Sequence, residues 1–224
     1  MIVLGYIASN YKKSNYKIVL SEQVYTRLLG LINLCGLNIN GEYDEFGSLF
    51  YGKFESNGVI FLESPSEVQD YQIQSKSFSM TDSMWKELES KIDDDNCRIF
   101  AHFHTHPYFQ DDRNRLYSTE DISFYQNLAI GLNNNRKNED QIIVLGCMAS
   151  VSGRNISSLD DISFVYYDTQ QHEMIYVPSI FVKIGNQEYE LEHVPDEYSY
   201  NGVSFPIDRT LLEINTDESQ KRHR

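Results

Sequence analysis

The chain has 224 residues, enough for one large domain or for a domain of about 150 residues with an extension. Hydrophobic residues make up 41% and charged residues 23%, which excludes an intrinsically disordered chain and allows a sizeable core. The formal net charge of -14 argues against nucleic-acid binding, because phosphate contacts need a basic surface.

Three cysteines, Cys35, Cys97 and Cys147, lie far apart and form no Cys-x-x-Cys pair. An odd and sparse count is typical of a reducing compartment and offers no disulfide framework. Cys97 and Cys147 border or lie inside apolar runs, so we expect buried free thiols at both positions.

The apolar segments are too short to cross a membrane, because none approaches the roughly 18 residues that a spanning helix needs. The apolar residues 1–5 are also too short for a signal peptide, and Lys12 and Lys13 follow them rather than precede them. We therefore expect a cytoplasmic protein whose partners include neither membrane nor nucleic acid.

The first part of the chain is expected to alternate strands and helices. An apolar strand spans 16–20, and Ser21 is placed to cap the helix that follows. The apolar residues of that helix recur at helical spacing, at Val24, Leu28, Ile32 and Cys35. After a loop, two β-rich runs at 46–54 and 58–62 are joined by a hairpin turn over 56–58, where Asn and Gly accept positive φ.

A second helix is expected from Thr81 or Asp82 to the acidic run at 93–95. Its apolar stripe consists of Met84, Leu88 and Ile92. Trp85 lies beside that stripe, and we expect it to pack inside. The strand 98–103 follows and leads directly into a segment rich in histidine.

A third helix is expected to begin at Ser118, after a loop over 108–117 that is rich in Asp, Arg and Asn. Its apolar stripe consists of Ile122, Tyr125, Ala129 and Leu132. The nearly continuous apolar run 141–148 is typical of a central buried strand, and 162–167 reads as a further strand.

This mixed order predicts an α/β (α+β) fold, in which a mixed, curved β-sheet has helices packed against it. We assign residues 1–175 to one domain and 176–224 to a C-terminal extension. The extension is expected to contain a β-hairpin over 180–192 and a flexible tail. It could add the hairpin to the sheet, cover a groove or dock a partner, and the sequence does not choose between these.

The histidine-rich segment is the candidate for chemistry. Alternate residues of a strand share a face, so His104 and His106 point the same way. Two such imidazoles can chelate one metal ion, and Asp121 at the start of the next helix can supply a third ligand. Zinc takes imidazole nitrogen and carboxylate oxygen, and a catalytic zinc site uses three protein ligands plus water.

Each of these residues also has a plainer interpretation. Paired histidines on a strand are often surface or core residues, and Ser118 with Asp121 has the outline of a capping box. His102 lies on the same strand face, where it could be a ligand, a partner of the ligands or a buried structural residue; we favour the last two. Asp111 or Asp112 in the preceding loop could compete as a ligand.

His104-Thr105-His106-Pro107 followed by Ser118-Thr119-Glu120-Asp121 resembles the signature of the JAMM/MPN+ metallopeptidases, and the run 45–52 (EFGSLFYG) fits the upstream glutamate and glycines of that family. The resemblance covers roughly residues 15 to 170. One departure is the separation of 118 − 106 = 12 positions between His106 and Ser118, which is longer than usual in the family.

The resemblance implies a cytidine-deaminase-like MPN/JAB architecture with Zn²⁺ held by His104, His106 and Asp121. It implies Glu45 as general base and Ser118 as donor to the oxyanion. Glu42 and Asp44 are close to Glu45, but the spacing from Glu45 to Gly52 matches the family.

By the same resemblance, the expected reaction is zinc-dependent cleavage after the C-terminal glycines of ubiquitin or a ubiquitin-like protein. That protein or its conjugates would be the substrate, and conjugation-pathway proteins are possible partners. An inactive MPN-type scaffold and a zinc hydrolase of a small amide are the alternatives.

Overall fold

The structure is a computed structural model. It describes residues 11–36, 45–68, 80–93, 97–108, 117–134, 136, 141–152, 162–191, 194, 197–200 and 203–206. These contain the helices α1 (Glu22–Gly36), α2 (Asp82–Asp93) and α3 (Thr119–Asn133) and a short 3-10 turn, η2 (Ser56–Gly58). The strands are β1 (Lys12–Lys13), β2 (Lys17–Ser21), β3 (Gly47–Glu55), β4 (Val59–Pro65), β5 (Ile99–Tyr108), β6 (Ile143–Ser152), β7 (Ile162–Asp168), β8 (Glu173–Val177), β9 (Ser179–Ile184), β10 (Gln187–Glu190), β11 (Glu197–Tyr200) and β12 (Val203–Pro206).

Ten of these strands form one curled, mixed sheet in the order β1-β8-β7-β6-β5-β3-β4-β2-β9-β10, and β11 pairs with β12 separately. Near the middle, β5 is antiparallel to β3 and parallel to β6. The chain passes from β5 to β6 through α3, as a parallel pair requires. The expected mixed sheet with flanking helices is confirmed.

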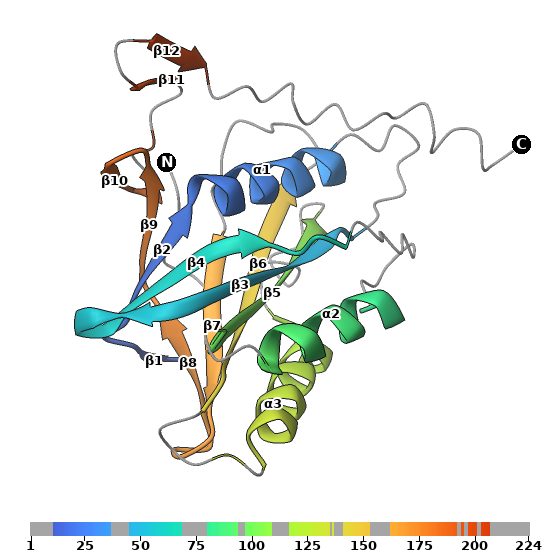
Figure 1. Cartoon of the computed structure of the whole chain (residues 1–224). Helices are drawn as coiled ribbons and strands as arrows, with labels where there is room; N and C mark the ends of the chain where they lie inside the picture. The colour runs from blue at the N-terminus through green and yellow to red at the C-terminus, as the bar shows by residue number, and fades with distance from the viewer. Residues whose placement is uncertain are drawn as a thin grey trace, which may run out of the picture.

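The core has two layers, one on each face of the sheet. One contains the buried side of α1 with residues such as Leu28, Phe50 and Phe103. The other joins α2 and α3 to the opposite face through residues such as Leu88 and Tyr125. Figure 1 shows α1 on one side of the sheet and α2 and α3 on the other. The strands near the middle are thus covered on both faces, which explains their continuous apolar runs.

The predicted helices and strands up to residue 167 are confirmed, with the expected turn at Asn57 and Gly58, whose φ values are 65° and 75°. Cys97 and Cys147 are buried free thiols, and burial raises the pKa of Cys147 well above its ordinary value. Trp85 was expected inside, but it is 36% exposed. It lies one residue past Met84, about 100° around the helix, and so stands at the edge of the buried stripe rather than within it.

The predicted hairpin is β9 and β10, and it joins the main sheet because β9 pairs in parallel with β2. The boundary that we placed after residue 175 falls inside β8, and the sheet continues across it. The strands β1, β8, β11 and β12 were not anticipated. The expected tail, beyond residue 206, lies outside the described residues.

Within the described ranges, no helix combines the length and the apolarity needed to span a bilayer.

Candidate metal centre

The three predicted ligands are brought together at the end of β5 and the start of α3. Phe103 on β5 packs in the α1 layer, whereas Phe100 packs in the opposite layer. Because side chains alternate along a strand, His102, His104 and His106 all face the α3 side. Strand periodicity therefore presents the two predicted ligands to the first turn of α3.

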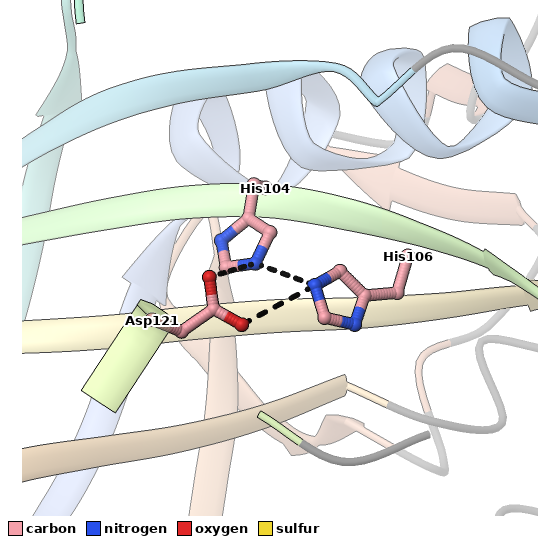
Figure 2. Close-up of side chains that lie close together, drawn as sticks. All are labelled: His104, His106 and Asp121. Carbon is pink, nitrogen blue, oxygen red and sulfur yellow. Dashed lines mark hydrogen bonds and ion pairs between the residues drawn. The ribbon is translucent and has the colours of Figure 1, made fainter. Parts of the chain in front are cut away.

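The ligand atoms converge on a small volume, as Figure 2 shows. The Nε2 atoms of His104 and His106 are 2.9 Å apart. His104 Nε2 lies 3.3 Å from Asp121 Oδ1, and His106 Nε2 lies 3.4 Å from Asp121 Oδ2. All three ligand atoms lie within 4.8 Å of one another. Two imidazole nitrogens and one carboxylate suit zinc, and two His with one carboxylate also suit ferrous iron.

The three side chains of the group differ in how far they are buried. The side chain of His104 is 3% exposed, whereas those of His106 and Asp121 are 12% and 19% exposed. Three protein ligands are the number found in catalytic zinc sites, whereas structural zinc sites usually have four.

Ser118 anchors the carboxylate of Asp121. Asp121 N–H donates to Ser118 Oγ (3.1 Å), and Ser118 N–H donates to Asp121 Oδ2 (2.7 Å), which completes a capping box at the start of α3. Ser118 Oγ–H also donates to Asp121 Oδ2 (2.8 Å). The capping role that the sequence suggested is confirmed, and it fixes the orientation of Asp121.

The charge state of Asp121 follows from these neighbours. Burial alone would raise the pKa of its carboxyl group, but hydrogen bonds from His104, His106 and Ser118 hold that pKa well below its ordinary value. Asp121 is therefore an anion at neutral pH, as a metal ligand must be.

His102 is not part of the ligand group. It is 5% exposed, and its Nδ1 lies 3.4 Å from the hydroxyl of Tyr125. Burial, with the nearby ring of His104, lowers the pKa of His102 from 6.5 to about 3, so His102 is neutral at pH 7. The structure thus places His102 beside the proposed ligands as a buried neighbour, in line with the two roles that we favoured from the sequence.

Glu45 lies two residues before β3, and β3 is the neighbour in the sheet of the strand that carries the histidines. Phe46 N–H donates to Thr105 Oγ1 (2.9 Å), and Thr105 N–H donates to the carbonyl oxygen of Phe46 (2.8 Å). Gly47 pairs with His104, so continuing this antiparallel register places Glu45 opposite His106. Directly opposed residues share a face, which puts Glu45 on the side of the ligand group.

The remaining candidates cannot be placed. Glu42 and Asp44, as well as Asp111 and Asp112, lie outside the described residues. The same is true of most of the 108–117 loop.

Two residues next to this site were not connected with it from the sequence, in which Tyr125 was only part of an apolar helix stripe. The hydroxyl of Tyr125 lies 3.2 Å from Nδ1 of His104, and Gly146 on β6 lies under the Tyr125 ring. The signal for Tyr125 is its position four residues after Asp121, on the same face of α3. Gly146 gives no such signal, because only the packing of α3 on β6 reveals it.

A comparison with protein-family profiles finds no match, and a comparison with curated proteins finds none. Among solved structures, the solution structure of protein DSY2949 from Desulfitobacterium hafniense is similar to this chain. The two share 14% sequence identity and a TM-score of 0.40, over 74% of this chain and 92% of that one. A likeness of this size carries no argument about fold or function.

Proposed function

We propose that this chain is a zinc-dependent metallopeptidase of the JAMM/MPN+ type, with the corresponding MPN/JAB architecture. The observation that carries the proposal is the convergence of His104 Nε2, His106 Nε2 and the Asp121 carboxylate, of which His106 and Asp121 are partly exposed. The residue types fit zinc as well as ferrous iron, and the resemblance of the motifs to the JAMM/MPN+ signature favours zinc.

Each polar residue has a role in this proposal. Zinc held by His104, His106 and Asp121 would supply a Lewis acid that acidifies water and polarises a carbonyl group. Glu45 accepts the proton of the attacking water and delivers it to the leaving amine. Ser118 holds Asp121 in place through its hydroxyl. To stabilise an oxyanion as well, that hydroxyl must give up its hydrogen bond to Asp121 and donate to the substrate oxygen instead.

The proposed substrate is a peptide or isopeptide bond after the C-terminal glycines of ubiquitin or a ubiquitin-like protein. This choice comes from the resemblance of His104-x-His106-Pro107 and Ser118-x-x-Asp121 to the family signature. A protein of a conjugation pathway is the corresponding partner, and the cytoplasm is the corresponding compartment.

The first test is the metal content of the purified protein by elemental analysis. We expect about one zinc per chain, and none in the His104→Ala/His106→Ala double variant. Iron instead of zinc in the wild type would replace zinc in the proposal and point to a different class of reaction. No metal in the wild type after reconstitution would favour the inactive scaffold.

The second test separates binding from chemistry. Glu45→Gln should keep zinc and lose turnover, because the amide cannot accept the proton. Glu120→Gln is the matched control, since Glu120 is exposed next to Asp121 and should keep full activity. The substrates are fusions to ubiquitin-like proteins and a panel of small amides. Cleavage of the small amides alone would replace the peptidase with a small-amide hydrolase, and near-normal activity of Glu45→Gln would refute its role.

A further inference from the structure

The ligand His104 has a buried partner on the side away from the metal position. Its Nε2 faces Asp121, while its Nδ1 lies 3.2 Å from the hydroxyl oxygen of Tyr125. That same hydroxyl lies 3.4 Å from Nδ1 of His102. A single tyrosine hydroxyl therefore contacts two histidine rings, of which one is a proposed ligand.

The donors and acceptors among His104, Tyr125 and His102 can be assigned once His104 binds a metal through Nε2. Nε2 must then carry a lone pair, so the ring proton of the neutral imidazole is on Nδ1. Nδ1–H donates to the Tyr125 oxygen, and the Tyr125 hydroxyl in turn donates to Nδ1 of His102. The ring proton of neutral His102 is then on its Nε2. Each of the two contacts has one donor and one acceptor.

The surrounding packing holds these three hydrogen-bonded side chains in place and keeps solvent away from them. Tyr125 is 0% exposed and His102 is 5% exposed. The ring of His102 contacts those of Phe124 and Tyr125, with centroids 5.0 and 5.8 Å apart. Gly146 leaves the space that the Tyr125 ring fills, since a Cβ there would lie 2.6 Å from its Cζ. A buried hydrogen bond without competing water fixes the ring orientation strongly.

We propose that Tyr125 and His102 form a buried hydrogen-bond relay that fixes the ring orientation and tautomer of His104 and thereby sets the metal affinity of the site. Tyr125 is a positioning residue, because it is fully buried and acts through His104 rather than on substrate. The inference rests on the proposed function insofar as His104 binds a metal, but it requires no peptidase activity.

The test measures the affinity of the full chain for Zn²⁺ by competition with a chromophoric chelator. Tyr125→Phe keeps the ring and removes the hydroxyl, and we expect it to weaken zinc binding by about 10- to 100-fold, as loss of such partners does elsewhere. Tyr117→Phe is the matched control. Its hydroxyl is also buried but bonds the carbonyl oxygens of Gly146 and Ser163, so its loss should lower stability and leave the zinc affinity unchanged.

The far end of the relay gives a second pair of variants. His102→Asn places an acceptor near the position of Nδ1 and should stay close to the wild-type affinity. His102→Leu removes the acceptor and should weaken zinc binding. This pair decides the question even if Tyr125→Phe does not fold.

A spectroscopic readout tests the proton order directly. In the zinc-loaded wild type, nitrogen-detected NMR should find the ring proton of His102 on Nε2 and that of His104 on Nδ1. In Tyr125→Phe, His102 should become a mixture of tautomers. A purely structural role for Tyr125 would leave the tautomer of His102 unchanged.

The outcomes separate this inference from the proposed function. Equal zinc affinity in the wild type and Tyr125→Phe would overturn the relay and leave the peptidase proposal standing. A wild type that binds zinc with the expected variant effects but cleaves no substrate would support the relay and overturn the peptidase. A wild type that binds no zinc would overturn both.

Discussion

Gly146→Ala should be strongly destabilising, because β6 has no room for a methyl group at this position. The added Cβ would lie 2.6 Å from Cζ and 2.7 Å from Cδ2 of Tyr125. Ordinary carbon contacts are about 3.5–4.0 Å, so the ring must retreat by about 1 Å. The hydroxyl contacts at 3.2 and 3.4 Å leave little margin for such a shift. Overpacking and the weakened hydrogen bonds together cost about 2 to 4 kcal/mol.

Urea denaturation measures this cost, and the chain offers a matched control. Gly131 near the end of α3 has nothing within 4 Å of an added Cβ, so Gly131→Ala should be neutral or stabilise by up to about 1 kcal/mol. Tyr125→Leu removes the ring that clashes, and in that background Gly146→Ala should cost less than about 1 kcal/mol. An equal cost with and without the Tyr125 ring would refute the reasoning.

Three further predictions concern stability and the cap. Gly52→Ala should cost at least as much as Gly146→Ala, because its Cβ would meet the backbone of Phe61 (3.0 Å from the carbonyl carbon), and urea denaturation checks this. In metal-free protein, His102 is protonated in the unfolded state below pH 6.5 but in the folded state only below about pH 3, so stability falls as the pH falls through this window. His102→Phe should make the dependence of unfolding free energy on pH shallower by up to about 1.4 kcal/mol per pH unit; an unchanged slope would contradict the buried neutral state. Ser118→Ala should cost about 1 kcal/mol through loss of the cap and should also weaken zinc binding, and an unaltered zinc affinity would show that Asp121 needs no anchor.

Patterns in the sequence predicted the helices and caps whose formation depends on residues close together along the chain. The helical stripe of Met84, Leu88 and Ile92 and the cap at Ser118 depend on neighbours a few residues away. β1 is different, because two lysines are a strand only through pairing with β8, more than 150 residues later. No local pattern encodes such a partner.

The candidate site shows the same division. The alternation of His104 and His106 and the helix start that places Asp121 in the first turn could be read from spacing, since each involves one element. The contact of Tyr125 with His102 and His104 depends on how α3 lies across β5 and β6. Gly146 reads as one more residue of an apolar strand until the tyrosine ring is placed over it.

The position of β2 in the sheet has a consequence for the order of folding. β2 lies between β4 and β9 and pairs in parallel with both. During synthesis, Ile18 and Leu20 can complete their core contacts only after Ile180 and Val182 have left the ribosome, and β1 must wait in the same way for β8. Contacts between residues so distant in sequence are slow to form. The N-terminal strands are thus the first part of the sheet to be made and among the last to be covered, so we expect nascent chains shorter than about 180 residues to depend on chaperones.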